Sequence, residues 1–408
     1  MSRNRTQTLL ALVLIAVGLL VTVILGVHTF MTMTATPWHP EPQSVSSVAH
    51  SEPPRRWMDA VERGRQIVRT DLSEQNLPGL SIAVGVGGEI VWAEGFGWAD
   101  LEQRVPVEPN LRFRIGTASK ALTSAAVGLL LEDKRLDLDD EIRMHVPGFP
   151  EKPWPVTLRH LMGHLAGVRT DGGDESPLYS QYCERTVEGL PFFADRSLLL
   201  EPGTEYRYSN YGWILVSAAV EAAANEPFLS FMQKQVFEPL GMHDTRADSS
   251  REPIPDRVTA YFPRYAADPA FGLHPMREID LSCYAGASVF LSTPSDLVRF
   301  GMAINDGKLL QPATVESLQT SQRLPSGEET GYGLGWDIET VTLAGAPTRV
   351  VGHDGEVLGG TVASLMTLRE RGIVVAVTSN ISYADTFAIA LKLAEAFVHE
   401  GGGVDDGR

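Results

Sequence analysis

The most regular hydrophobic pattern in the chain covers residues 118–131. Apolar side chains recur there every three or four positions, as on the buried face of a helix, and the pattern ends in the charged residues 132–135. Residues 112–115, just before it, have the composition of an extended segment. The pattern predicts a strand or loop that leads through a turn of small residues into a buried helix.

Strand patterns occur near both ends of the chain. Residues 81–86 and 89–97 are β-rich runs separated by Gly87 and Gly88, which is a strong hairpin signal. Strands are expected again only late, at residues 349–353, 360–369 and 373–379. Helices are expected at residues 57–72, 157–162, 216–224, 228–236, 293–304 and 384–399.

This order of elements predicts the fold class. Strands at both ends and helices in the centre are most simply combined in one antiparallel sheet built from both ends of the domain. The terminal helices would cover this sheet, and a mainly helical lobe would be inserted between its two halves. The expected architecture is therefore α/β (α+β).

The N-terminal region predicts a membrane helix. Residues 9–27 carry no charge and are preceded by Arg3 and Arg5, and about nineteen residues suffice to cross a hydrocarbon core of roughly 30 Å. The positive flank places the N-terminus in the cytoplasm and the main domain outside it, in the periplasm or the extracellular space. An uncleaved signal anchor is expected because no clear small-residue cleavage site follows; a cleaved signal peptide is the alternative.

The expected organisation has four parts. Residues 1–30 form a cytoplasmic tip and the membrane anchor, and residues 31–56 form a Pro-rich spacer. Residues 57–399 form the domain, and residues 400–408 form a flexible tail.

Composition and charge narrow the partners. The chain has 408 residues, 43% of them hydrophobic, so it can bury a large core, and its net charge of −17 argues against a nucleic-acid partner. Cys183 and Cys283 are the two cysteines; they can pair in an oxidising compartment or remain two buried thiols. The expected partners are a small-molecule or peptide substrate and the membrane, and the oligomeric state is left open.

A hydroxyl and a lysine stand at the start of the predicted buried helix. Thr117 is a good N-cap residue, so it can simply cap the helix. Lys120, however, is a cation in the first turn, where the helix dipole disfavours it. A neutral lysine one turn after a hydroxyl suits the activation of a nucleophile, if its surroundings lower its pKa from roughly 10.4.

Two later motifs also suit a reaction site. Tyr208 and Asn210 lie two residues apart before an apolar helix, where both can point into a cleft or can instead cap and pack. His353 is followed by Gly355 at a strand end, where exposed backbone can bind a substrate and a free N–H can stabilise an oxyanion. His164 reads as a satisfied structural histidine at a helix end.

No motif for a metal or a nucleotide is present. The sequence contains no HExxH motif, no Cys/His cluster, no Walker-type loop and no GxGxxG after a strand. No cofactor is therefore expected.

Taken in order, the three motifs resemble those of a known superfamily. Hydroxyl-x-x-Lys, Tyr-x-Asn and His-x-Gly occur here in the order found in the serine β-lactamase and penicillin-binding-protein-like superfamily, in its class C, esterase and D-aminopeptidase branch. The surrounding phrases are similar too, among them residues 79–84, 95–100, 158–164, 201–204, 290–297 and 331–336.

The resemblance implies covalent acyl-enzyme chemistry without a metal, in a cleft between the sheet and the helical lobe. Thr117 would be the nucleophile, Lys120 its general base, Tyr208 the group that moves a proton to the leaving group, and Asn210 a substrate ligand. His353 would take the place of the lysine in the Lys-Thr-Gly motif of β-lactamases. The backbone N–H groups of Thr117 and Glu356, the latter next to Gly355, would form the oxyanion hole.

Two residues depart from the family pattern. The nucleophile is Ser in the family and Thr117 here, and Ser119 does not replace it because Leu122, not Lys, stands three residues after Ser119. Glu356 is acidic, and its charge would disfavour anionic substrates such as penicillins.

Three functions follow as hypotheses. The first is a membrane-anchored extracytoplasmic hydrolase that cleaves an ester or peptide bond through an acyl-enzyme on Thr117. The alternatives are a non-catalytic protein that binds peptides or peptidoglycan fragments on the same fold, and a β-lactamase.

Overall fold

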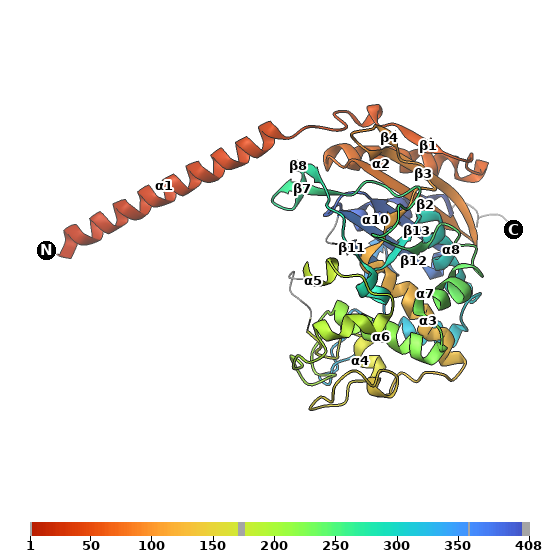
Figure 1. The fold of residues 1–408 in the computed structure, drawn as a ribbon. Coiled ribbons are helices and arrows are strands. Elements are labelled where there is room, and N and C mark those ends of the chain that lie inside the picture. The colour runs from red at the N-terminus through yellow and green to blue at the C-terminus, as the bar shows by residue number, and fades with distance from the viewer. Residues whose placement is uncertain (1, 170–175, 358–359, 402–408) are drawn as a thin grey trace.

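The core of the molecule is an antiparallel sheet formed by both ends of the domain. The computed structural model describes residues 2–169, 176–357 and 360–401 (Figure 1). The sheet has the order β1-β3-β2-β13-β12-β11-β10, with β4 paired to β3. Its strands are β1 Ser47–Ala49, β2 Gly79–Val86, β3 Glu89–Asp100, β4 Val105–Pro106, β10 Asp337–Leu343, β11 Ala346–Val357, β12 Thr361–Leu368 and β13 Ile373–Ser379. The N- and C-terminal halves join where β2 pairs with β13, so the predicted architecture is confirmed.

Alternation along the central strands creates two apolar layers. On β13, Val375 and Val377 belong to one hydrophobic cluster, together with the helices α2 Met58–Glu74 and α10 Thr386–Gly401. Val374 and Ala376 belong to the other cluster, which includes α8 Pro294–Asn305 and α3 Ser119–Glu132. The sheet is therefore covered on both faces, and α3 lies between it and the helical lobe.

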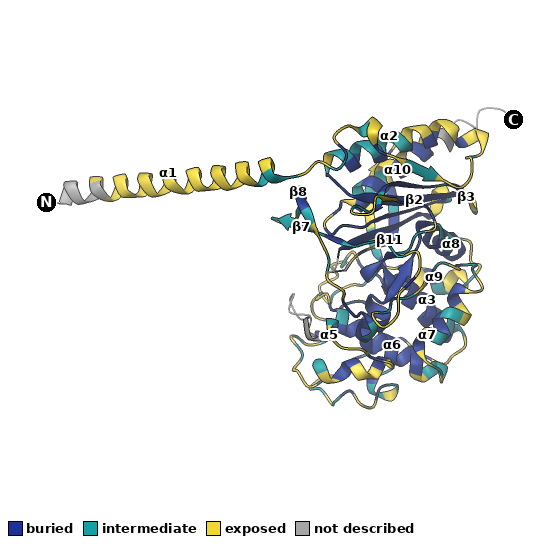
Figure 2. Ribbon diagram, turned by 45° about the horizontal axis from the view of Figure 1, so that its top comes forward, coloured by how far each residue is buried: buried dark blue, intermediate teal, exposed yellow. Residues whose placement is uncertain are grey.

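The helical lobe contains several of the predicted helices. Its main members are α4 Leu158–Met162, α5 Ser176–Tyr179, η5 Thr186–Phe192, α6 Asn210–Ala224, α7 Phe228–Phe231 and η6 Met232–Phe237. Threonine side chains cap two of the predicted helices: the Thr157 side chain accepts from the N–H of His160 at the start of α4, and the Thr293 side chain accepts from the N–H of Asp296 at the start of α8. Figure 2 shows α6 as a mainly buried helix in this lobe, with α3, also mainly buried, between α6 and the sheet.

The expectation that strands return only late in the chain is wrong. Between the two halves of the main sheet the chain contains a hairpin of β7 Tyr261–Tyr265 and β8 Asp268–Pro275, and a small sheet in the order β5-β9-β6. The strands of this small sheet are β5 Phe113–Arg114, β6 Arg246–Ala247 and β9 Phe290–Ser292. Strands of two or three residues are too short to show an alternating pattern, and prolines and glycines interrupt the hairpin.

The N-terminal helix projects from the domain. The helix α1 runs from Ser2 to Thr34 (Figure 1), and its segment Leu9–Thr34 is long and apolar enough to cross a membrane, with a hydropathy of 3.0 and none of it buried. The segment at 31–56, expected to be an extended spacer, packs against the domain instead. The N–H of Trp38 donates to Asn76 Oδ1 at 2.9 Å, and β1 pairs with β3.

A disulfide closes a long loop in the lobe. Cys183 and Cys283 are bonded, with 100 residues of sequence separation between them. Cys283 lies in η7 Ser282–Ala287, which packs on α6. Of the two alternatives left open by the sequence, the structure contains the paired form.

Removing this disulfide is expected to lower stability. Replacing both Cys183 and Cys283 with Ala should reduce the free energy of unfolding by about 3 kcal/mol, because the unfolded chain loses the constraint of a long closed loop. Thermal unfolding without reductant measures the effect, and wild-type protein with reductant is the control. Equal unfolding midpoints for variant and wild type would contradict the prediction.

Candidate active site

Thr117 lies on a short turn where the small sheet meets the buried helix. The turn η3 Gly116–Ala118 connects β5 to α3, and Thr117 is partly exposed on it. Its Oγ1 donates a hydrogen bond to the carbonyl of Asp354 on β11, at 3.2 Å. The residue before α3, Ala118, has no side-chain cap. The interpretation of Thr117 as a helix cap is therefore wrong.

Ser119 is not accessible as a replacement nucleophile. Its side chain is fully buried, and its Oγ lies 3.4 Å from the N–H of Phe290 on the neighbouring strand β9. Thr117 is thus the hydroxyl of this pair that reaches the surface of the site.

Lys120 joins the first two motifs. It is fully buried in the first turn of α3, yet its Nζ donates to Tyr208 Oη at 2.5 Å and to Asn210 Oδ1 at 2.8 Å. Burial disfavours the charged form of an amine, and hydrogen-bond partners offset part of this cost. The structure therefore brings Lys120 together with Tyr208 and Asn210, which lie 88 and 90 residues after it in the sequence.

The local sequence explains why Tyr208 and Asn210 both reach Lys120. Ser209 is the N-cap of α6, and its side chain accepts from the N–H of Gly212. Asn210 is therefore the first helical residue rather than part of a loop, whereas Tyr208 comes just before the cap. Tyr208 is 37% exposed, so it can meet both Lys120 and a ligand.

His164 holds the backbone of residues 207–209, next to Tyr208, in place. Its Nδ1 accepts from the N–H of Ser209 at 3.1 Å, its carbonyl accepts from the N–H of Arg207 at 2.8 Å, and its ring lies 4.3 Å from the ring of Tyr208. Burial lowers the pKa of His164 well below 6.5, and the charge of Lys120 acts in the same direction. His164 is therefore a neutral residue beside the site.

The expectation of a satisfied histidine at a helix end needs correction. With Nδ1 as an acceptor, the proton of neutral His164 is on Nε2, and that atom has no hydrogen-bond partner among the described residues. His164 also has a φ of +58°, a conformation that few non-glycine residues adopt. The contact with Ser209 spans 45 residues, so no local pattern predicts it.

The strand β11 presents an open edge to Thr117. Its pairing with β10 ends at Gly352, so the backbone beyond has a partner strand on the β12 side alone. The backbone N–H and the backbone carbonyl of Asp354 both point to the open side, since the N–H donates to the Asp337 carboxylate and the carbonyl accepts from the Thr117 hydroxyl. Strand residues alternate in direction, so the N–H of Glu356 points to the same side.

Gly355 is required where β11 approaches the turn. A Cβ at this position would lie 2.0 Å from the carbonyl oxygen of Ile115 and 2.5 Å from the nitrogen of Ala118. Any side chain there would separate the strand from η3. The glycine of the His-x-Gly motif therefore has a steric explanation in this structure.

His353 and Tyr332 form a buried pair under the strand. His353 Nδ1 donates to the carbonyl of Asp354 at 2.5 Å, and its Nε2 accepts from the hydroxyl of Tyr332 at 3.0 Å. Burial lowers the pKa of His353 and raises the pKa of Tyr332 well above 10. Sequence reasoning did not assign a role to Tyr332; its glycine neighbours at 331 and 333 were the available signal.

The Glu356 side chain is directed away from this edge of the strand. Its Oε1 accepts from the N–H of Tyr383, in the loop after β13, at 3.2 Å. Burial raises the pKa of the Glu356 carboxyl. For metals, the described parts of the chain contain no group of three His, Cys, Asp or Glu residues that could hold an ion.

Comparison with known proteins identifies the family. The model of the family described as Beta-lactamase matches residues 65–400. The chain belongs to the beta-lactamase family of serine hydrolases. The match includes every residue discussed above as part of the site.

Curated relatives and solved structures agree with this family. The human serine beta-lactamase-like protein LACTB, mitochondrial, is 26% identical, with 88% of this chain and 83% of the relative covered. Penicillin-binding protein 4* of Bacillus subtilis is 26% identical, with 77% and 71% covered. The octameric penicillin-binding protein homologue from Pyrococcus abyssi superposes with a TM-score of 0.70 at 25% identity, covering 83% of this chain and 77% of that one. The D-amino acid amidase from Ochrobactrum anthropi, complexed with L-phenylalanine amide, has the same fold, with a TM-score of 0.72 at 24% identity and 84% and 99% covered.

The glycine contact predicts a sharp steric effect. Gly355→Ala should destabilise the fold by about 3 kcal/mol or more, because the clash is with backbone atoms that cannot rotate away. Gly148→Ala is the matched control, since a Cβ there meets nothing within 4 Å. Chemical denaturation measures both variants, and equal effects of the two would refute the steric explanation.

The buried His164 predicts loss of stability in acid. The folded protein keeps His164 neutral, whereas the unfolded chain takes up a proton near pH 6.5, so stability should fall as the pH drops below 6.5. His164→Asn keeps an acceptor and tolerates positive φ, and it should flatten this dependence by up to about 1.4 kcal/mol per pH unit. Urea unfolding between pH 5 and 7 tests this, and an unchanged slope in the variant would show that His164 does not titrate as described.

Proposed function

We propose that this protein is a membrane-anchored hydrolase that cleaves an ester or amide bond through an acyl-enzyme on Thr117. One observation carries the proposal: the buried Lys120 is hydrogen-bonded to both Tyr208 and Asn210, one helical turn after the surface hydroxyl of Thr117. A buried lysine with these partners is costly for folding, and catalysis gives a reason for it.

Acylation begins with proton transfer. Neutral Lys120 accepts the hydroxyl proton of Thr117 while Oγ1 attacks the substrate carbonyl. For this step the Thr117 hydroxyl exchanges its bond to the Asp354 carbonyl for one to Lys120. The tetrahedral oxyanion receives hydrogen bonds from the backbone N–H groups of Thr117 and Glu356, one from the turn and one from the open strand edge.

Collapse of this intermediate releases the first product. Tyr208 passes a proton to the leaving alcohol or amine, and the proton is replaced from Lys120 through their 2.5 Å hydrogen bond. A water molecule then loses a proton to the same pair and attacks the acyl-threonine. The second product is a carboxylic acid, and Thr117 regains its hydroxyl proton.

Substrate binding would use the same open edge. A substrate amide that lies along β11 can pair with the exposed groups of the strand, and Asn210 can bind its carbonyl. His353 and Tyr332 support the strand from below and keep its carbonyl at Asp354 in place.

Two features support an extracytoplasmic compartment for the main domain. The apolar helix Leu9–Thr34 suits a single membrane anchor, and Arg3 and Arg5 before it favour a cytoplasmic N-terminus. The Cys183–Cys283 disulfide favours an oxidising environment for the main domain. We therefore place the active site outside the cytoplasm.

A non-catalytic binding protein is the second candidate. Thr117 favours it, because the extra methyl group restricts the side-chain rotamer and crowds the path of attack. A cleft that binds peptides or peptidoglycan fragments needs the strand edge and Asn210 but no nucleophile. A β-lactamase is a third candidate, and hydrolysis of nitrocefin tests for it.

Covalent trapping separates the first two candidates. The full chain should react with a fluorophosphonate probe at Thr117, and peptide mass spectrometry locates the adduct. Thr117→Ala should abolish labelling, Lys120→Met should slow it by roughly 100-fold or more, and Thr117→Ser should equal or exceed wild type.

Ser119→Ala is the matched control for this experiment. Ser119 is buried two residues from Thr117, so its loss should leave labelling close to wild type. No labelling of wild type, under conditions that label a serine relative, would overturn the acyl-enzyme and favour the binding protein.

A further inference from the structure

A small pocket lies at the C-terminal end of β11, the strand whose Asp354 carbonyl accepts a hydrogen bond from Thr117. It has a volume of ≈ 230 Å³ and is lined by Thr361, Arg114 and the segments that flank the β7–β8 hairpin. Thr361 pairs with Val357, the last residue of β11. Asp354, which binds Thr117, is three residues before Val357, so the pocket lies about 10 Å along the strand from the nucleophile.

Two of the three arginines that line the pocket, Arg114, Arg257 and Arg277, are held by one buried carboxylate. Asp248, with a side chain 1% exposed, accepts from Arg114 Nε at 2.7 Å and from Arg257 Nη1 at 2.9 Å. Two guanidinium groups and one buried carboxylate leave one positive charge without a buried partner. The site is therefore built to hold one more anion.

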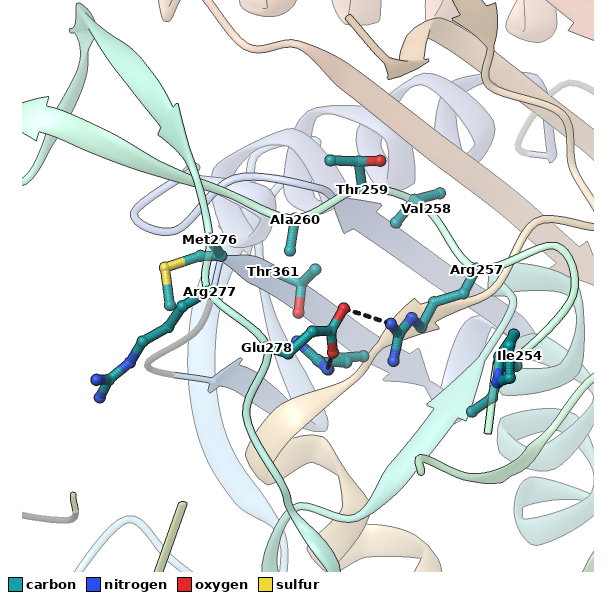
Figure 3. Close-up of a pocket in the computed structure, with 11 residues that line it drawn as sticks. Ile254, Arg257, Val258, Thr259, Ala260, Met276, Arg277, Glu278 and Thr361 are labelled. Carbon is teal, nitrogen blue, oxygen red and sulfur yellow. Dashed lines mark hydrogen bonds and ion pairs between the residues drawn. The ribbon is translucent and has the colours of Figure 1, made fainter. Parts of the chain in front are cut away.

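Glu278 supplies that anion in the present structure. Its carboxylate lies 2.7 Å from Arg257 Nη2 and 3.5 Å from Arg114 Nη2, and Figure 3 shows it between Arg257 and Thr361. In contrast to Asp248, its side chain is 67% exposed. An exposed side chain can turn into solvent at little cost, so the Glu278 carboxylate is exchangeable and the Asp248 carboxylate is not.

Thr361 gives a second, independent indication of a ligand. The residue is 1% exposed, and its Oγ1 has no hydrogen-bond partner among the described residues. Figure 3 shows the hydroxyl directed into the pocket, toward the Glu278 carboxylate. Buried hydroxyls are normally paired, so an unpaired one that faces a pocket marks a place for a ligand atom.

We propose that this pocket is a subsite for a carboxylate of the substrate, which displaces Glu278 and is bound by Arg257, Arg114 and the Thr361 hydroxyl. The proposal rests on the proposed function and adds the substrate class: a chain with an acidic group about 10 Å from the bond that is cleaved, the distance along β11. The pocket is smaller than sites for whole ligands, which are roughly 300–1,000 Å³. It therefore fits a terminal or side-chain carboxylate rather than a whole molecule.

Direct binding tests the subsite without any turnover. Suberate, an eight-carbon dicarboxylate, is titrated into the full chain in detergent by calorimetry. Glu278→Ala should bind it about tenfold tighter than wild type, because the internal competitor is removed. Glu252→Ala is the matched control, since Glu252 is an exposed acid that pairs with Arg246 and does not line the pocket.

Two further variants keep the test independent of folding. Thr361→Val has nearly the same shape and removes a hydroxyl without a described partner, so it should fold normally and bind suberate several-fold more weakly. Arg257→Met should weaken binding further. Equal affinity of wild type, Glu278→Ala and Thr361→Val would overturn the proposal, as would tighter binding of inorganic phosphate than of suberate in Glu278→Ala.

A pair of esters links the pocket to the reaction. Mono-(4-nitrophenyl) suberate and 4-nitrophenyl octanoate have acyl chains of equal length and differ in the terminal carboxylate. The suberate ester should have a kcat/KM about tenfold higher than the octanoate ester, and Thr361→Val should bring the two values closer together. Equal hydrolysis of both esters would contradict the carboxylate subsite and leave the proposed hydrolase activity supported. Suberate binding without hydrolysis of either ester would instead contradict the proposed hydrolase activity and support the carboxylate-binding pocket.

Discussion

The approach of β11 to the turn before α3 is the constraint on which the rest of the site depends. At Gly355 the two backbones are so close that a Cβ would lie 2.0 Å from the carbonyl oxygen of Ile115. This contact holds Thr117 against the open edge of the strand, where its hydroxyl binds the Asp354 carbonyl. The sheet is built from both ends of the domain, so the nucleophile candidate and the strand it contacts, 237 residues apart in sequence, are brought together by the fold of the whole domain.

A second constraint is the burial of Lys120 under the aromatic residues of the lobe. An amine with no exposure must be hydrogen-bonded, and Tyr208 and Asn210 provide the bonds. His164 then holds the backbone between these two residues and stays neutral, so it adds no positive charge beside Lys120. The lobe therefore contributes Tyr208 and Asn210, α3 contributes Lys120, and the sheet contributes the backbone edge, so the candidate site lies at the boundary between sheet and lobe.

The sequence predicts the fold and the main site residues better than the side-chain contacts that hold those residues in place. The antiparallel sheet, the helix α3 and the meeting of Lys120 with Tyr208 and Asn210 follow from long periodic segments and from motifs in a recognisable order. The pairs His164–Ser209 and Tyr332–His353 could not be predicted, because each joins segments that are 45 or 21 residues apart and show no periodic pattern. In the small sheet β5-β9-β6, the extended segment at β5 was predicted but β6 and β9 were missed, because strands of two or three residues are set by their neighbours in the tertiary structure rather than by their own propensity.

The threonine at position 117 is best understood from its surroundings. Its β-branched side chain has few rotamers, and in the observed one the hydroxyl donates to the Asp354 carbonyl. A serine at this position would have more rotamers and could leave this hydrogen bond more easily. The free energy of that hydrogen bond, about 1 kcal/mol net, is small compared with the barrier of an acyl transfer, so the bond alone does not prevent attack. Full burial of an unused amine would cost several kcal/mol, so the burial of Lys120 favours the proposed acyl transfer over a site that has lost its chemistry.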